Sequence, residues 1–269
     1  MAGTLTIHLS EITIYPIKSM KGVALQSAKV ELRGLQFDRR WMLVDRDATF
    51  ISQRDVPRLA LISTQIKEDS IIVEAPGKQR LSLPAKMSGS TPISVRVWDD
   101  TVRVLPAGRE ADEWFSDFAG VDCRPVYMPD DSLRPVEPRY ALASDIVSLA
   151  DGFPLLLVSQ ASLNDLNGRL PEPVPMNRFR PNIVVSGSGA FDEDGWKKIR
   201  IGDLSLRIVK PCSRCVTTTV DQSTGVQGKE PLATLSRYRN FNGKVHFGQN
   251  AIPENEAVIR LGDRVELIS

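Results

Sequence analysis

The sequence lacks an apolar run that could cross a membrane, and it shows no secretion signal. Its longest apolar run is FPLLLV at 153–158, whereas a membrane helix needs about 20 such residues. The opening stretch MAGTLTIHLSEITIYPIKS alternates as a strand does, without the basic and continuous apolar parts of a signal peptide. We therefore predict a cytoplasmic protein with no membrane association.

Cysteine and histidine are scarce, with three and two residues. An odd cysteine count without a secretion signal argues against a disulfide framework. Zinc needs four ligands, and beside Cys212 and Cys215 the chain offers only Cys123, His8 and His246, none with a paired spacing. An iron–sulfur cluster is also excluded, because it needs about four cysteine ligands and the chain has three. The net charge of +1 provides no overall field that would attract nucleic acid.

Much of the sequence shows the alternation of apolar and polar residues that is typical of β-strands. Period-two alternation dominates and changes phase at Ser10–Glu11, which predicts a bulge. Two-residue turns are predicted at Asp99–Asp100, Gly202–Asp203 and Gly262–Asp263. Helical patterns are confined to three short stretches, at 111–118 before Gly120, at 160–170 after a Ser159 cap, and after Pro231. The pattern predicts a mainly β (α+β) fold with short helices.

The segment YMPDDSLRPVEPRYALASD at 127–145 is rich in proline and charge. Such a composition is typical of a long connection. We therefore predict two domains, a strand-rich one at 1–125 and a second at 126–269.

The stretch KPCSRCVTTTVD places Cys212 and Cys215 with two residues between them, and the cations Lys210 and Arg214 lie beside them. A redox pair would need a helix after its first thiol, but the flanking LSLRIVK and VTTTV favour strands, with Pro211 ending the first. Two alternatives stay open at this point. The thiols are either buried core cysteines, or one is a thiolate favoured by the adjacent cations that ligates a soft metal whose other ligands come from a cofactor.

Three further stretches carry clustered cations. YPIKSMKG places Lys18 and Ser19 at the end of the first strand, and FDRRW places Arg39 and Arg40 so that one faces inward and the other outward. NRFRPN places Arg178 and Arg180 on one side of an extended segment, because Arg180 precedes a proline. Guanidinium groups bind phosphate or carboxylate in a two-pronged manner. A solvated turn and ordinary ion pairs are the alternatives; together the stretches favour a basic site beside the thiolate.

Five stretches resemble, in order, the signature motifs of MOSC-domain proteins: YPIKSMKG, DRRWMLVD, NRFRPNIVVSG, FDEDGWKKIRIGD and KPCSRCVTTTVDQSTG. Within that family the chain resembles the amidoxime-reducing components and their bacterial counterparts, from about residue 9 to the C-terminus. The resemblance implies a MOSC β-barrel with an N-terminal MOSC-associated domain and a molybdenum–molybdopterin cofactor. It implies that Cys215 ligates molybdenum and is the catalytic cysteine. The implied cofactor-binding residues are Lys18, Ser19, Arg39, Asp151, Arg180, Asn182, Ser213 and Arg214.

Three features of some family members are not expected in this chain. They are an appended ferredoxin-like domain, an N-terminal membrane segment and a pyridoxal-phosphate domain. The resemblance implies reduction of N-hydroxylated compounds, with electrons from a separate redox protein of the ferredoxin, flavin or cytochrome type. Cys212 is expected to be structural. The alternatives are a carrier that passes the cofactor or its sulfurated form to a partner, and a strand-rich scaffold with ordinary ion pairs.

Overall fold

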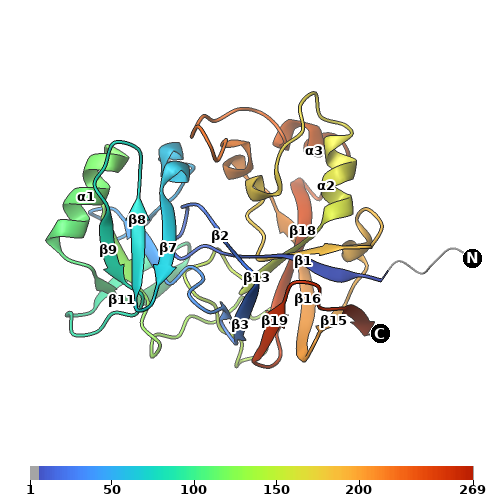
Figure 1. Cartoon of the computed structure of the whole chain (residues 1–269), viewed down its shortest axis with the longest axis horizontal. Coiled ribbons are helices and arrows are strands. Elements are labelled where there is room, and N and C mark those ends of the chain that lie inside the picture. The colour runs from blue at the N-terminus through green and yellow to red at the C-terminus, as the bar shows by residue number, and fades with distance from the viewer. Residues whose placement is uncertain (1–5, 269) are drawn as a thin grey trace, which may run out of the picture.

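The computed structural model describes residues 6–268, which form a mainly β protein as the alternation predicts (Figure 1). The strands build one nine-stranded sheet, one five-stranded sheet and two three-stranded sheets. The described residues also contain three α-helices, α1 (Arg109–Ala119), α2 (Gln160–Asn167) and α3 (Leu232–Tyr238). No helix in residues 6–268 is long and apolar enough to span a bilayer.

The nine-stranded sheet joins the beginning of the chain to its second half. Its central strands are antiparallel except for the parallel pair β13–β14. A register shift between Leu9 and Glu11 confirms the predicted bulge. The strands in order are β2 (Val23–Leu25), β1 (His8–Ile14), β14 (Ile183–Ser186), β13 (Leu155–Ser159), β18 (Lys244–Pro253), β16 (Leu204–Ser213), β15 (Lys198–Ile201) and β20 (Val265–Ile268), with β17 (Asn240–Phe241) beside β18.

The smaller sheets lie mostly in the first half of the chain. The five-stranded sheet contains β10 (Ile93–Val97), β11 (Asp100–Pro106), β12 (Arg124–Tyr127), β5 (Trp41–Val44) and β6 (Phe50–Ile51). The first three-stranded sheet is β19 (Ala257–Arg260), β3 (Ser27–Glu31) and β4 (Gly34–Leu35), and the second is β7 (Ser63–Lys67), β8 (Ser70–Glu74) and β9 (Leu81–Pro84). Because β1 pairs with β14 and β3 pairs with β19, the two ends of the chain are interleaved. The domain boundary at 125/126 stays a prediction.

Apolar periodicity explains the helices. In α1 the residues Ala111, Trp114, Phe115 and Phe118 share one face and are buried in the core, and Gly120 ends the helix with φ of +73°. The side chain of Ser159 accepts a hydrogen bond from the Ser162 backbone N–H at the start of α2, as expected of an N-cap. Leu170 is buried but lies beyond the end of α2, and Pro231 lies at the N-cap of α3 rather than in its first turn.

Of the three predicted hairpin turns, one is right. Gly202–Asp203 does join β15 to β16. The β10–β11 turn is shifted by one residue, to Trp98–Asp99, because Val97 pairs with Asp100. The Gly262–Asp263 prediction is wrong, since β19 pairs with β3 and β20 with β15, so this segment turns a corner between two sheets.

Gly34 offers a test of close backbone approach. Its φ is +115°, and a Cβ at this position would lie 2.6 Å from the carbonyl oxygen of Pro154. We expect Gly34→Ala to lower the free energy of unfolding by about 2–3 kcal/mol, because backbone strain and a clash act together. Gly77 also has a positive φ, +73°, but nothing lies within 4 Å of its Cβ position. Gly77→Ala should therefore lower the free energy of unfolding, measured in urea, by only about 1 kcal/mol. Equal losses in the two variants would contradict this explanation.

Candidate functional site

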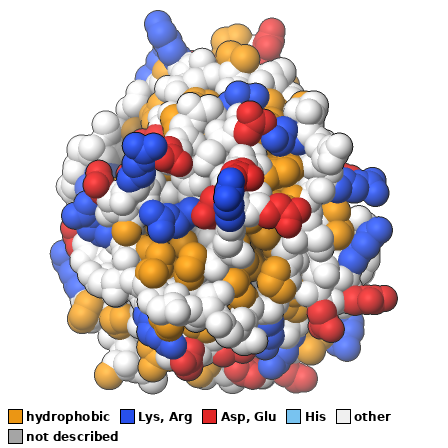
Figure 2. Space-filling view, turned by 90° about the vertical axis from the view of Figure 1, so that its left-hand side faces the viewer, with side chains coloured by type: hydrophobic (Ala, Val, Ile, Leu, Met, Phe, Trp, Pro, Cys, Tyr) orange, Lys and Arg blue, Asp and Glu red, His pale blue; other side chains and the backbone are white. Residues whose placement is uncertain are grey.

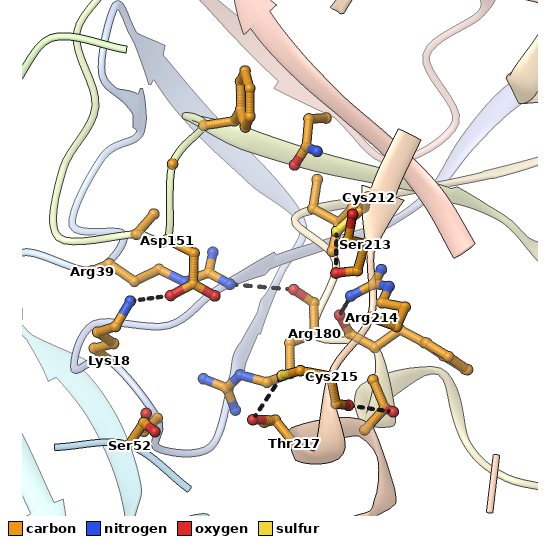
Figure 3. Close-up of a pocket in the computed structure, with 18 of the residues that line it drawn as sticks. Lys18, Arg39, Ser52, Asp151, Arg180, Cys212, Ser213, Arg214, Cys215 and Thr217 are labelled. Atoms are coloured by element: carbon orange, nitrogen blue, oxygen red, sulfur yellow. Dashed lines mark hydrogen bonds and ion pairs between the residues drawn. The ribbon is translucent and has the colours of Figure 1, made fainter. Parts of the chain in front are cut away.

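A cavity of about 320 Å³ brings together residues that are far apart in the sequence (Figure 3). Its walls come from the segments after β1, before β5, after β6, after β10, before β13, before β14 and at the end of β16. All the predicted site residues line it: Lys18, Ser19, Arg39, Asp151, Arg180, Asn182, Ser213, Arg214 and Cys215. Residues from both halves of the chain therefore meet around one pocket.

Cys215 lies in the loop that follows β16, and its side chain is exposed to the cavity. The local structure corrects two predictions. Strand β16 continues through Pro211 to Ser213, and the following residues Val216–Thr219 form a 3₁₀ helix, η4, instead of a strand. The Cys215 carbonyl accepts hydrogen bonds from the backbone N–H and hydroxyl of Thr218, and its sulfur lies 3.4 Å from the Thr217 hydroxyl. These contacts hold the sulfur at the pocket wall.

The three thiols have different environments. Cys123 is buried beside Ser116, and burial raises the pKa of its thiol to about 11. Cys212 is half-buried, and burial raises the pKa of its thiol as well, although Arg214 opposes the shift. Cys215 is the exposed cysteine of the three.

These environments predict a strict order of alkylation. At pH 8, iodoacetamide should modify Cys215 first and Cys212 more slowly. Cys123 should remain essentially unmodified, because a pKa of about 11 leaves on the order of one thiolate in a thousand at that pH. Peptide mass spectrometry of timed samples measures the order. Modification of Cys123 as fast as Cys215 would show that the burial described here is wrong.

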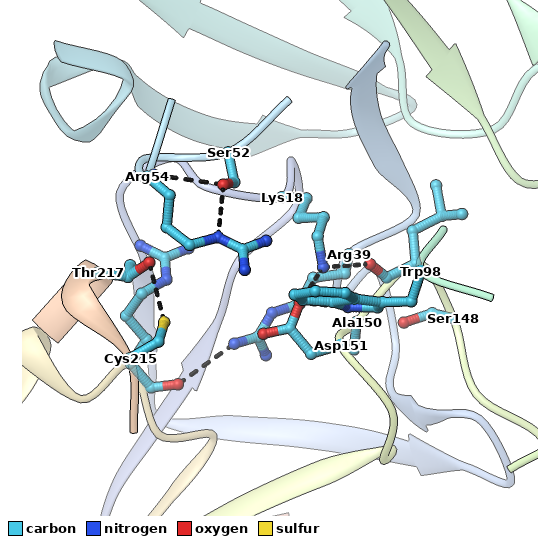
Figure 4. A network of polar contacts seen from close by, with 12 residues as sticks. Lys18, Arg39, Ser52, Arg54, Trp98, Ser148, Ala150, Asp151, Cys215 and Thr217 are labelled. Carbon is cyan, nitrogen blue, oxygen red and sulfur yellow. Dashed lines mark hydrogen bonds and ion pairs between the residues drawn. The ribbon is translucent and has the colours of Figure 1, made fainter. Parts of the chain in front are cut away.

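Lys18 and Asp151 form an ion pair at one side of the cavity (Figure 4). The ammonium of Lys18 is buried and also donates to the carbonyl of Leu149 at 3.0 Å, and burial lowers the pKa of this lysine. Although partial desolvation by the cavity walls around Asp151 opposes it, the charge and hydrogen bond of Lys18 hold the pKa of the carboxyl well below its usual range. The pair therefore stays ionic at neutral pH. The Asp151 side chain, 75% exposed, is free to contact a ligand.

Arg39 is held by a buried polar network. Its Nη1 donates to Asp38 at 2.7 Å and to the Asn182 side-chain oxygen at 3.0 Å, and its Nη2 donates to the Arg180 carbonyl at 3.2 Å. Its guanidinium lies 4.1 Å from the centroid of the Tyr15 ring. The Asn182 side-chain oxygen also accepts a hydrogen bond from the Leu156 backbone N–H, and its amide nitrogen donates to the Thr13 carbonyl, so this buried residue positions Arg39.

Two predictions about arginine orientation are wrong. Arg39 and Arg40 do not alternate between inside and outside, because both side chains are nearly buried, and Arg40 donates to the Met128 carbonyl and to Asp130. Arg180 is not extended. Its φ is +56°, and its guanidinium lies 4.3 Å from the Tyr15 ring centroid. Contacts with Arg39 and Tyr15 outweigh the local preference imposed by the following proline.

Arg178 faces a different segment from Arg180, contrary to prediction. It is buried and donates to the carbonyls of Thr218, Thr219 and Glu230 and to the carboxylate of Asp221. It therefore anchors the segment that follows Cys215.

Arg214 and Lys210 are also engaged elsewhere. The Arg214 guanidinium donates to the carbonyls of Phe247 and Phe179, while its Nη2 is buried without a hydrogen-bond partner in the described residues. The Lys210 ammonium lies 3.3 Å from a Glu137 carboxylate oxygen. Neither cation forms a hydrogen bond with the Cys215 sulfur, so the sequence argument that they favour a thiolate there gains no support from these contacts.

The cavity lining is strongly cationic. Six lining residues are cations and one, Asp151, is a carboxylate; the cations are Lys18, Arg39, Arg54, Arg178, Arg180 and Arg214. Figure 2 shows cationic and anionic side chains interspersed on one outer face. The excess in the cavity is therefore not a continuation of a basic surface on that face. Burial lowers the pKa of Arg180 to about 10, as expected for a desolvated cation that an anionic ligand would stabilise.

Sequence reasoning missed Ser52, Arg54 and Trp98 in this lining. Trp98 at a hairpin tip, where Gly, Asn or Asp is usual, is the one signal that could have identified them. The described residues contain no group of three His, Cys, Asp or Glu side chains that could hold a metal ion. The pocket thus fits an anionic ligand that brings most of its own metal ligands, with one thiol added by the protein.

Comparison with known proteins agrees with this geometry. Residues 6–122 match the MOSC N-terminal beta barrel domain, and residues 144–266 match the MOSC domain. Mitochondrial amidoxime-reducing component 1 of Mus musculus is 37% identical over 279 residues, covering 97% of this chain and 82% of that protein. The chain belongs to the amidoxime-reducing component family of MOSC proteins. Mitochondrial amidoxime-reducing component 1 of Homo sapiens is 34% identical over 278 residues, covering 97% of this chain and 82% of that protein.

Both MOSC matches contribute to the pocket of this family member. Lys18 and Arg39 lie within the MOSC N-terminal match, and Asp151, Arg180 and Cys215 lie within the MOSC match. Among solved structures, the YuaD protein from Bacillus subtilis shares 11% sequence identity and a TM-score of 0.45, covering 97% of this chain and 94% of that chain.

Proposed function

We propose that this chain is a molybdenum-dependent oxidoreductase that reduces N-hydroxylated compounds, such as amidoximes, hydroxylamines and N-hydroxylated bases. The observation that carries the proposal is the exposed sulfur of Cys215 in a pocket lined by six cations and one carboxylate. The names of the relatives, amidoxime-reducing components, supply the reaction class.

The residues of this chain would divide the binding of a molybdenum–molybdopterin cofactor among them. Cys215 would contribute the protein's sulfur ligand. Lys18, Ser19, Arg39 and Arg180 would hold the phosphate and pterin, since guanidinium and ammonium groups bind phosphate through charge-assisted hydrogen bonds. Asp151 and Ser213 would offer polar groups to the pterin, and Asn182 and Arg214 would position the walls. When bound, the cofactor supplies the two-electron chemistry, and the protein supplies orientation and electrostatics.

The overall reaction needs a separate electron donor. Breaking one N–O bond consumes two electrons and two protons, and the oxygen leaves as water while the substrate gains an N–H bond. The cysteines of this chain could supply electrons only by becoming oxidised themselves. We propose a ferredoxin-, flavin- or cytochrome-type protein as the donor. The cytoplasmic location stays a prediction.

The exposure of Cys215 also suits a second function. An open thiol in a cationic pocket could accept the cofactor, or its sulfurated form, and release it to a partner enzyme. Such a carrier would bind molybdenum without catalysing reduction.

Metal analysis combined with turnover separates these possibilities. Freshly purified protein from cells with an intact cofactor pathway should contain molybdenum and a fluorescent pterin. It should also reduce benzamidoxime to benzamidine when a chemical electron donor is supplied. Bound molybdenum without turnover would favour the carrier, and protein without molybdenum or pterin would contradict both proposals.

A further inference from the structure

Arg54 is a cation of the cavity that the proposed cofactor site does not use. It follows the short strand β6 and comes from a different wall than the cluster of Lys18, Arg39 and Arg180. Its guanidinium lies 4.3 Å from the Trp98 ring centroid and 5.6 Å from that of Phe50. Figure 4 shows Arg54 and Trp98 beside the open space that Cys215 also faces.

The side chain of Arg54 is held in place while most of its donors stay free. Its Nε donates to the Ser52 hydroxyl at 3.2 Å, and this hydroxyl donates to Asp55 at 3.0 Å. Within residues 6–268 neither terminal nitrogen of Arg54 forms a hydrogen bond, and no carboxylate pairs with it. Stacking on the two aromatic rings and the hydrogen bond to Ser52 hold the guanidinium in place. Its free nitrogens are therefore positioned to donate two hydrogen bonds to an oxyanion.

Charge balance indicates what that edge binds. Lys18 is paired with Asp151, Arg39 with Asp38 and Arg178 with Asp221. Two nitrogens of the Arg214 guanidinium donate hydrogen bonds to backbone carbonyls. In the described part of the chain, Arg180 and Arg54 are then the cavity cations that have neither a carboxylate partner nor a backbone carbonyl bound to the guanidinium. Arg180 belongs to the proposed phosphate cluster, and the carbonyls of Phe247 and Phe179 hold the guanidinium of Arg214. The terminal nitrogens of Arg54 therefore remain for a further anion.

Trp98 strengthens the case that this wall is built for a ligand. It is 43% exposed, although its indole donates to Asp151 at 3.4 Å, and its φ is +59°. The two-residue hairpin turn requires this positive φ, and a bulky aromatic residue there costs about 1 kcal/mol or more compared with glycine. The other three tryptophans, Trp41, Trp114 and Trp196, are buried.

We propose that Arg54, whose guanidinium stacks on Trp98, is a specificity-determining residue that binds a carboxylate on the N-hydroxylated substrate. This inference rests on the proposed function. A carboxylate carries the opposite charge, and its two oxygens match the two-pronged donor geometry of this guanidinium.

The test compares benzamidoxime with 4-carboxybenzamidoxime in the wild-type holoprotein and in Arg54→Met. The expected result is a fall of at least about tenfold in the ratio of kcat/KM for the carboxylated over the neutral substrate, since a charge-assisted hydrogen bond is lost. Molybdenum per chain should equal the wild-type value. Arg58→Met is the matched control. Arg58 also stacks on an aromatic ring, Phe118, and lacks an ion pair in the described residues, but it lies outside the cavity.

An unchanged ratio in Arg54→Met, or an equal fall in Arg58→Met, would overturn the proposal. A loss of molybdenum in Arg54→Met would also overturn it, because Arg54 would then hold the cofactor. A binding measurement keeps the inference testable if the protein does not turn over. Benzoate should quench the fluorescence of exposed Trp98 at lower concentration than the neutral benzamide does, and Arg54→Met should remove that difference. If no difference exists in the wild type, the proposal fails independently of the proposed function.

Discussion

Replacing Cys215 with alanine is expected to lower bound molybdenum and benzamidoxime reduction by more than about 100-fold. Removing groups that only orient a metal ligand typically costs 10- to 100-fold in affinity or activity, so removal of the ligand itself should exceed that range. Molybdenum per chain is measured by elemental analysis, and turnover by benzamidine formation with a chemical electron donor.

Cys212→Ala is the matched control for this experiment. Cys212 also lines the cavity, but it is half-buried, and burial raises its pKa, which disfavours the thiolate that a metal requires. The variant should keep most of its molybdenum and activity. Equal losses in the two variants, or no loss in either, would remove Cys215 from the role of ligand.

Replacing Arg178 with methionine is expected to lower the free energy of unfolding by about 3 kcal/mol. This buried guanidinium donates to three backbone carbonyls and to Asp221. Methionine fills a similar volume but leaves these acceptors unpaired, each at a cost of about 1–3 kcal/mol when water cannot reach it. Because Thr218 and Thr219 lie in η4, which begins directly after Cys215, bound molybdenum should also fall.

Arg109→Met controls for the loss of an arginine as such. Arg109 is exposed and forms an i,i+4 pair with Glu113 in α1, and such surface pairs contribute little. Urea unfolding followed by tryptophan fluorescence should show no measurable change for this variant. If Arg178→Met unfolds at the same urea concentration as Arg109→Met, the anchoring of η4 by Arg178 is refuted.

Local sequence features predicted the elements that depend on neighbouring residues alone. The bulge at Leu9–Glu11, the Ser159 cap and the end of α1 at Gly120 follow from periodicity and from the backbone preferences of single residues. The cavity residues were found because basic and thiol-bearing motifs recur in a family order, although their distances in sequence are large.

The failures occur where distant contacts override local preference. VIRLGDRVELI has the alternation and turn of a hairpin, yet β19 and β20 find different partners in β3 and β15. VTTTV is rich in β-branched residues, but hydrogen bonds from Thr218 to Cys215 and from Arg178 to the segment stabilise a 3₁₀ turn. Arg54 was missed because its role depends on Trp98, a neighbour only in the folded chain.

The central claim is that the Cys215 sulfur ligates a pterin-bound molybdenum ion, and X-ray absorption at the molybdenum edge tests it most directly. The wild-type protein should show one sulfur scatterer more than the pterin dithiolene provides. The molybdenum that Cys215→Ser retains should lack this extra sulfur. An identical sulfur shell in the two proteins would contradict the account.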